Sequence, residues 1–235
     1  MSPDERLVFG APIDGLLDRL YSADDGQREG VFAYFSARAA EASMDWNRFD
    51  ARTNEFLRDK FIALDRPKAE FCYSVCRALG ARRIVEAGTS FGVSTLFLAT
   101  AVRDTLQQDG GDRGTGLVIA TEYEPDKARI ARRHFAEAGL ERFIDLREGD
   151  LRRTLADIDG PIDFMLVDIW TPMARPALEL VAPHLREGAV IICDNTSQFR
   201  DAYADYFAFV RDPRNGFRTM TLPFEGGLEF TVRAR

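Results

Sequence analysis

The sequence predicts an α/β fold in which a mostly parallel sheet is covered by helices on both faces. From residue 82 onward, short apolar runs alternate with segments of helical periodicity. One of these runs passes into a helix through a turn that contains Gly88 and Gly92. The residues before 82 show only helical patterns, so we expect an N-terminal helical layer in front of the sheet.

Length and composition limit the classes of protein that the chain can be. Its 235 residues are 46% hydrophobic and 29% charged, which is enough for one substantial core. We expect one continuous domain, with residues 1–64 as a helical extension or lid and residues 65–235 as the main body. The net charge of −7 disfavours a general nucleic-acid binder.

The sequence also bears on the compartment. No apolar stretch is long enough to cross a bilayer, and the first residues are too acidic for a signal peptide. We therefore expect a cytoplasmic protein. Cys72, Cys76 and Cys193 form no disulfide framework. Cys72 and Cys76 have a spacing that could hold two metal ligands, but burial in the core is the favoured interpretation because no further Cys or His completes the set.

The helical patterns separate into two groups. Before residue 82, polar breaks and Pro67 divide them into four expected helices: 13–21, 28–44, 49–64 and 68–79. After residue 82, the helices expected between the apolar runs are 93–106, 127–138, 151–158, 175–184 and 201–210.

The apolar runs predict the strands of the sheet. They are residues 84–85, 117–121, 143–146, 164–167, 189–193, 217–222 and 228–232. Only residues 223–227 separate the last two, so these two strands should form an antiparallel hairpin at the end of the sheet.

The turn after the first strand is the centre of the predicted site. Such a junction leaves the amides of a helix N-terminus facing a ligand in a crevice. A dinucleotide site requires G-x-G-x-x-G, whereas here Thr89 and Ser90 follow Gly88, and the next glycine is Gly92. Glu86 is a poor neighbour for phosphates and a good one for an ammonium group. These residues disfavour an NAD-dependent oxidoreductase, and a purely structural turn is the alternative.

The segment Glu86-x-Gly88-x-x-x-Gly92 resembles the first motif of class I S-adenosylmethionine-dependent methyltransferases. The resemblance covers residues 65–235. It implies a Rossmann-like, seven-stranded, mostly parallel sheet whose last strand is antiparallel, in agreement with the predicted hairpin. It also implies S-adenosylmethionine as cofactor, held around the turn by Glu86, Gly88, Thr89, Ser90, Gly92 and Ser94.

Acidic residues follow the second and third predicted strands. In the family, a carboxylate at the tip of the second strand takes both ribose hydroxyls, and Glu122, followed by Tyr123, matches it. Glu124 is a less favoured candidate, because it could simply complement the next helix dipole. Asp150 and Leu151 resemble the segment that holds the adenine. The N-cap of the following helix is an equally good role for Asp150.

The fourth strand is followed by Asp168 and the fifth by Asp194 and Asn195. Three such oxygen donors suit Mg²⁺. They resemble the catechol O-methyltransferase-like branch, in which an Asp after strand four and an Asp-Asn pair after strand five bind Mg²⁺. The pair could share one ion only if the chain leaves the strand there, as Thr196 indicates. Trp170 matches an aromatic residue near the substrate, and an acidic residue at 168 also occurs in relatives without metal.

The general base is where this sequence departs from the pattern. Several relatives carry a lysine shortly after the fourth-strand Asp, but this chain has Thr171 and Pro172. Lys68 matches a lysine before the first strand of catechol-type relatives, which makes it the candidate partner of Asp168 in catalysis. A solvated lysine at a helix start is nevertheless the favoured interpretation. Either the metal alone acidifies the substrate hydroxyl, or the chain methylates a group that is already nucleophilic.

Specificity is expected in the N-terminal helices and around Trp170, Thr171 and Phe199. The helices offer an aromatic inner surface, whose alternative roles are core or dimer contact, made of Phe32, Tyr34, Phe35, Trp46 and Phe49.

These observations together predict a methyltransferase that uses S-adenosylmethionine, with Mg²⁺ assistance, to O-methylate a small hydroxylated, catechol-like molecule. The alternatives are a metal-independent N- or C-methyltransferase and a non-catalytic cofactor-binding interaction module. The expected partner is a small-molecule substrate, with neither nucleic acid nor a membrane, and a homodimer is left open.

Overall fold

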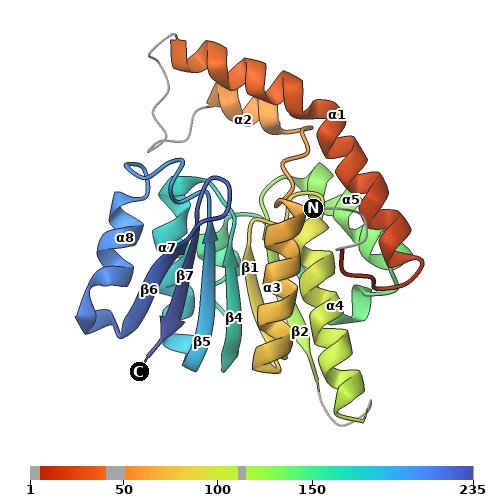
Figure 1. Cartoon of the computed structure of the whole chain (residues 1–235), viewed down its shortest axis with the longest axis vertical. Coiled ribbons are helices and arrows are strands. Elements are labelled where there is room, and N and C mark those ends of the chain that lie inside the picture. Colours follow the sequence, from red (N-terminus) through yellow and green to blue (C-terminus); the bar gives the residue numbers. More distant parts are fainter. Residues whose placement is uncertain (1–5, 41–50, 111–114, 235) are drawn as a thin grey trace.

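The structure, a computed structural model, describes residues 6–40, 51–110 and 115–234. Its strands are β1 (Arg83–Ala87), β2 (Leu117–Glu122), β3 (Ile144–Glu148), β4 (Ile162–Val167), β5 (Leu185–Asp194), β6 (Phe217–Leu222) and β7 (Leu228–Arg233). They form one seven-stranded sheet in the order β3-β2-β1-β4-β5-β7-β6 (Figure 1). Strand β7 runs antiparallel to both of its neighbours, and the other pairs are parallel. The predicted fold class and terminal hairpin are confirmed.

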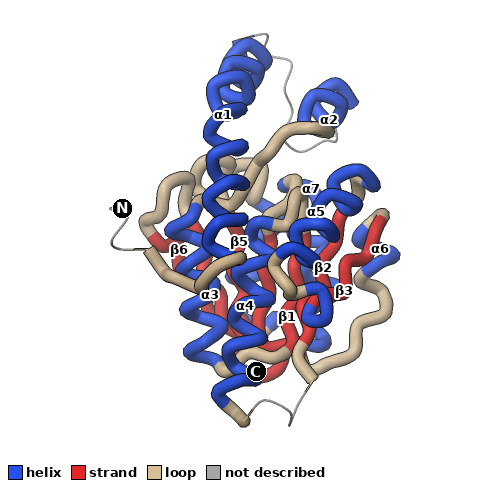
Figure 2. Tube along the Cα trace, turned by 90° about the vertical axis from the view of Figure 1, so that its right-hand side faces the viewer, coloured by secondary structure: helices blue, strands red, loops and turns tan. Residues whose placement is uncertain are grey.

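Successive residues of a strand point to opposite faces of the sheet, and apolar side chains cover both faces. Ile84 and Leu166 pack on one face with α3 (Arg66–Leu79), α4 (Val93–Gln108) and α5 (Pro125–Glu137). Val85 and Val167 pack on the other with α6 (Leu151–Thr154), α7 (Thr171–Val181) and α8 (Ala204–Arg211). Figure 2 shows α3 and α4 side by side over their face of the sheet. Burial on both faces explains why the inner strands are continuous apolar runs.

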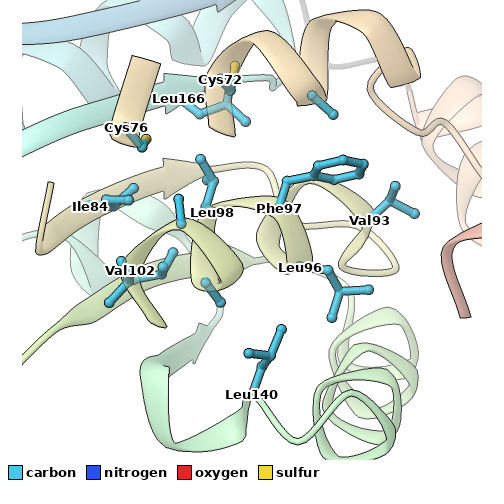
Figure 3. Packing of buried hydrophobic residues seen from close by; sticks show 14 of the residues in the cluster. Cys72, Cys76, Ile84, Val93, Leu96, Phe97, Leu98, Val102, Leu140 and Leu166 are labelled. Atoms are coloured by element: carbon cyan, nitrogen blue, oxygen red, sulfur yellow. The ribbon is translucent and has the colours of Figure 1, made fainter. Parts of the chain in front are cut away.

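The cysteines of α3 belong to this core. Cys72 and Cys76 are buried and free, and Figure 3 shows them above Ile84 and Leu98. Burial raises the pKa of the Cys72 thiol, so a metal-binding thiolate is disfavoured there. The interpretation of both residues as small core side chains is confirmed.

The N-terminal layer differs from the prediction. A single helix, α1 (Ile13–Ala40), replaces the two expected before residue 44, and α2 (Ala51–Leu57) is shorter than the expected helix 49–64. The break predicted between residues 21 and 28 contains polar side chains that form hydrogen bonds with a later segment of the chain. Asp24 accepts a hydrogen bond from the Ala63 amide at 3.0 Å, and Gln27 accepts one from the Phe61 amide at 3.0 Å. These bonds let α1 continue and hold residues 61–63 outside a helix.

Two further helix boundaries differ for identifiable reasons. Helix α6 ends at Thr154 rather than at 158, because the Arg147 guanidinium binds the carbonyls of Thr154 and Asp157. Helix α7 begins at Thr171 rather than at 175, because Pro172 is well suited to a first turn.

Helix α1 packs against the main body with its first half. Ile13, Leu16, Leu17 and Leu20 are buried in the same core as α3 and α4. Its second half and α2 lie above the carboxyl ends of the strands (Figure 1). The boundary at residue 64 stays a prediction. In the described part of the chain, none of the helices has the length and apolarity needed to cross a bilayer.

Candidate functional site

The turn between β1 and α4 depends on its two glycines. Gly88 has φ of 101° and Gly92 has φ of 90°, in the left-handed region that disfavours side chains. A Cβ at Gly88 would overlap the carbonyl oxygen of Asp168, and one at Gly92 would lie 2.5 Å from the Phe135 ring. The first glycine therefore lets the turn pack directly against the end of β4.

Glu86 holds this turn from below. It is wholly buried, and its carboxylate accepts hydrogen bonds from Ser94 at 2.6 Å, Thr95 at 2.5 Å and Thr89 at 2.9 Å. Burial raises the pKa of Glu86 to about 6. Three hydroxyl donors on a dry carboxylate tie the turn to the first residues of α4. The contact with a ligand ammonium that the sequence suggested for Glu86 stays a prediction.

A cavity of about 950 Å³ opens above the turn. Residues at the ends of five strands, β1 to β5, meet in its wall, which includes Asn195. Most of the predicted cofactor residues line it: Gly88, Thr89, Ser90, Ser94, Glu122, Tyr123, Asp150, Leu151, Asp168 and Trp170. Glu86 and Gly92 lie beneath the cavity rather than in its wall. The turn, the acidic tips and the aromatic residue after β4 thus face one space.

Glu122 connects the tips of β1 and β2. One carboxylate oxygen accepts a hydrogen bond from the Ser90 amide at 2.7 Å, and the other accepts one from the Glu124 amide at 2.8 Å. Burial raises the pKa of Glu122. Each oxygen keeps a further lone pair, so the oriented carboxylate fits a ribose diol. Glu124 instead pairs with Arg58, Oε2 to Nε at 3.6 Å.

Asp150 performs the capping role that the sequence offered as one of two alternatives. It accepts a hydrogen bond from the Arg152 amide at 3.0 Å at the start of α6. The Arg152 guanidinium also binds this carboxylate and lowers the pKa of Asp150. Because Asp150 lines the cavity as well, a contact with adenine stays a prediction and would compete with Arg152.

Lys68 is not the solvated lysine that was the favoured interpretation. Its side chain is 2% exposed, and its Nζ lies 2.7 Å from Asp194 Oδ1 and 3.3 Å from Asp65 Oδ2. Asp194 is itself buried at the end of β5, so it requires a counter-charge. Burial alone would lower the pKa of Lys68, but the attraction and hydrogen bond of Asp194, with Asp65, outweigh burial and raise it.

The rest of the predicted metal site adjoins this ion pair. Asn195 has φ of 58°, so the chain leaves the strand there as expected, and its Nδ2 donates to Asp194 Oδ2 at 3.0 Å. Asp168 is close enough that burial, followed by the charges of Asp194 and Glu86, raises its pKa well above the ordinary value.

As arranged, these residues do not fit Mg²⁺, which requires near-octahedral oxygen ligands at about 2.0–2.1 Å. Each oxygen of Asp194 already accepts a hydrogen bond, one from the Lys68 ammonium and one from Asn195 Nδ2, so an ion there would share the carboxylate with a buried positive charge. The magnesium assignment is therefore not confirmed.

Part of the chain is similar in sequence to known proteins. Residues 85–196 match a methyltransferase domain family. A catechol O-methyltransferase of Mycobacterium tuberculosis is 30% identical over 135 residues, which are 57% of this chain and 57% of that protein. Over this segment, the predicted resemblance to class I methyltransferases of the catechol O-methyltransferase-like branch is confirmed. The matched segment spans little more than half of that relative's length.

Solved structures share the fold of this chain. The O-methyltransferase TomG from Streptomyces achromogenes, solved in complex with SAM, has a TM-score of 0.65 and 22% identity, over 79% of this chain and 87% of its own. A putative O-methyltransferase from Klebsiella pneumoniae has a TM-score of 0.66 and 18% identity, over 96% of this chain and 91% of its own.

Part of the cavity wall was not predicted from the sequence. Phe61 stacks on Phe91 with ring centroids 4.1 Å apart, and Lys127 Nζ lies 5.2 Å from the centre of the Phe91 ring. All three line the cavity. Burial lowers the pKa of Lys127. Because Phe91 lies within the glycine turn, the sequence could have indicated that it lines the cavity. Its stacking on Phe61 joins segments that are distant in the sequence, and no local pattern predicts such a contact.

The expected aromatic surface is present in part. Phe32 and Phe35 line the cavity, whereas Tyr34 stacks on Phe56 with ring centroids 3.8 Å apart. The other two members, Trp46 and Phe49, lie outside the described residues. Trp170, Thr171 and Phe199 line the cavity as expected.

Proposed function

We propose that this chain transfers the methyl group of S-adenosylmethionine to a hydroxyl oxygen of a small, largely apolar molecule. The observation that carries the proposal is the shared cavity. The turn at Gly88 and the carboxylate of Glu122 line the same space as Asp168 and Trp170. A cofactor and a second molecule could therefore meet at the end of β4, as an in-line displacement requires.

The chain's own residues suit the three parts of the cofactor. Glu122 would hold the ribose hydroxyls, the segment at Asp150 and Leu151 the adenine, and the turn from Gly88 to Ser90 the amino-acid end. S-adenosylmethionine supplies an electrophilic methyl group on a sulfonium. The protein's part is to hold and orient the two reactants and to keep water away from them.

The substrate end of the cavity is aromatic. Phe32 and Phe35 of α1 line the cavity together with Trp170 and Phe199. Large aromatic side chains form flat apolar walls, and ring stacking adds to their affinity for aromatic ligands. This lining supports an aromatic or otherwise apolar alcohol, such as a phenol or catechol, as the substrate class.

Asp168 is the acceptor for the hydroxyl proton in this proposal. It is the carboxylate at the end of β4 in the cavity wall, and its raised pKa makes it a stronger base than an ordinary aspartate. The proton passes to Asp168 as the substrate oxygen forms its bond to the methyl carbon and the bond from carbon to sulfur breaks. The products are a methyl ether and S-adenosylhomocysteine, and Asp168 returns the proton to water. Thr171 has no comparable basicity.

Calorimetry with S-adenosylhomocysteine tests the cofactor half. The intact protein should bind it, and Glu122→Ala should weaken binding at least about tenfold, because charge-assisted hydrogen bonds contribute roughly 1.5–3 kcal/mol each. Glu124→Ala is the matched control, and we expect it to change the affinity less than about threefold. Absence of binding, or equal losses in the two variants, would contradict the proposal.

Turnover tests the chemical half. The protein should release S-adenosylhomocysteine from S-adenosylmethionine with at least one member of a panel of phenols, catechols and apolar alcohols. Asp168→Asn should lower kcat about 100-fold or more if it accepts the proton. Methylation of amines or carbon acids alone would favour the N- or C-methyltransferase alternative. Cofactor binding without turnover on any panel member would favour a non-catalytic module.

A further inference from the structure

The buried ion pair between Lys68 and Asp194 lies where the catechol-type resemblance assigns a magnesium ion. Lys68 Nζ is 2.7 Å from Asp194 Oδ1, and both side chains are buried. Asp65 Oδ2, 3.3 Å away, adds a second negative partner. One ammonium thus compensates a group of carboxylates that would otherwise need a cation in a dry environment.

The placement of Lys68 is rigid. The next residue, Ala69, is fully buried, and one and two turns further along α3 Cys72 and Cys76 are buried in the core. The N-terminal turn of α3 is also held by hydrogen bonds from the Lys68 and Ala69 amides to the Asp65 carbonyl, at 2.9 and 3.0 Å. The backbone of Lys68 is therefore fixed at the start of α3, from which its ammonium reaches Asp194.

Two further oxygens of the predicted metal set, Asp194 Oδ2 and Asn195 Oδ1, have other neighbours. The second oxygen of Asp194 accepts a hydrogen bond from Asn195 Nδ2 at 3.0 Å. The amide oxygen of Asn195 lies against the β6–β7 hairpin, where a Cβ at Gly226 would be 2.6 Å from it. Binding of a divalent ion at Asp194 would break these contacts of the protein. The ion would also lie beside the Lys68 ammonium, and the repulsion between the two charges is strong in a low-dielectric interior.

We propose that the Lys68 ammonium is the resident cation of this site. It occupies the position on Asp194 that a divalent ion would need, so the chain excludes Mg²⁺ and methyl transfer proceeds without it. Lys68 acts as a positioning residue, because it touches Asp194 and Asp65 rather than the cavity. The claim about methyl transfer rests on the proposed function, whereas the claim about ion exclusion does not.

Electron paramagnetic resonance of Mn²⁺ tests ion exclusion directly, because the signal of the free ion falls when the ion binds. Wild-type protein should leave the signal unchanged at equimolar Mn²⁺. Lys68→Ala should lower it, with a Kd at least about tenfold below that of wild type, and Lys68→Ala combined with Asp194→Asn should restore it. Lys60→Ala removes a lysine outside the site and should behave as wild type.

Two results would overturn the proposal. One is Mn²⁺ binding by the wild type that Asp194→Asn abolishes, and the other is a folded Lys68→Ala variant that gains no binding. If Lys68→Ala does not fold, Lys68→Met retains the stem of the side chain. The Tm of the wild type supplies an independent measurement: it should be the same with excess Mg²⁺ and with EDTA, and a rise of about 4 °C or more with Mg²⁺ would contradict exclusion.

The EDTA experiment then separates the two claims. Methyl transfer by the wild type should continue at the same rate in EDTA, and loss of activity that Mg²⁺ restores would overturn the metal-independent reaction. The Mn²⁺ result decides the ion site even if no substrate in the panel is methylated, so failure of the proposed function and failure of this inference are distinguishable.

Discussion

At the scale of single residues, Glu86 shows how a motif residue can stabilise a site without lining it. Its pKa is raised by burial from 4.5 to about 6. Between these values the folded state binds more protons than the unfolded state, so this group's contribution to stability grows as pH falls from 7 towards 4.5 and is lost as pH rises through 6. The neighbouring Glu122 charge acts in the same direction.

Glu86→Gln should remove this dependence. In wild type the group should raise the free energy of unfolding by about 1 kcal/mol at pH 5 relative to pH 7, and the variant should lack this gain. Urea unfolding at the two pH values measures the difference. Glu141→Gln, an exposed glutamate, is the control and should keep the wild-type dependence. An unchanged pH profile in Glu86→Gln would contradict the assignment.

At position 88 the fold has no room for a side chain. Gly88→Ala combines a left-handed φ with overlap against the Asp168 carbonyl, so we expect a loss of at least about 3 kcal/mol of stability. Gly139 also has a positive φ, but nothing lies within 4 Å of its Cβ position. Gly139→Ala should therefore cost only about 1 kcal/mol. Equal losses in denaturant unfolding would show that close packing at Gly88 does not matter.

At the scale of elements, helix α1 shapes the cavity by binding the segment 61–64. Gln27 and Asp24 accept hydrogen bonds from its amides, and the Tyr21 hydroxyl donates to the Leu64 carbonyl at 2.9 Å. Because Phe61 and its neighbours line the cavity and Phe61 stacks on Phe91 of the glycine turn, these bonds connect a distant helix to the wall of the site.

Asp24→Ala should therefore affect ligand binding as well as stability. Loss of a buried acceptor should lower stability by about 1–3 kcal/mol, and loss of the support for Phe61, which stacks on Phe91 of the glycine turn, should weaken the binding of S-adenosylhomocysteine several-fold. Asp25→Ala is the matched control, because Asp25 is exposed and pairs only at the surface with Arg28. Comparable effects of the two substitutions would exclude a specific role for the contact at Ala63.

Helix α1 is also an element that the sequence did not predict correctly. The strands were predictable because strands buried on both faces are short continuous apolar runs, as at 164–167 and 189–193. The ends of α1, α2 and α6 were not, because side chains such as Asp24 and Arg147 form hydrogen bonds with backbone groups in other segments. The periodicity of apolar residues within one segment cannot predict these hydrogen bonds.

At the scale of the whole molecule, the N-terminal layer shares its core with the sheet domain. Leu16 and Leu17 are fully buried among residues of α3 and α4. Deletion of residues 1–64 would expose this surface, so the remaining chain should lose its cooperative thermal transition, as measured by circular dichroism.

Single substitutions in the N-terminal layer test whether its buried side chains, rather than the mere presence of the segment, stabilise the protein. Leu16→Ala should lower the free energy of unfolding by about 2–5 kcal/mol, whereas Val8→Ala, at an 80% exposed position, should change it by less than about 0.5 kcal/mol. A stable, cooperatively unfolding fragment 65–235 would instead support the predicted boundary at residue 64.

The sequence by itself determined the sheet, the glycine turn and the order of the acidic strand tips, because these follow from local periodicity and from fixed spacing along the chain. Only the tertiary structure decided which of those acids faces the cavity and which is neutralised. Lys68 and Asp194 are 126 residues apart, and the pair exists because α3 packs beside the end of β5. A contact that depends on the packing of two elements has no signature in either segment. That contact, rather than a magnesium ligand set, is what we propose for the end of β5.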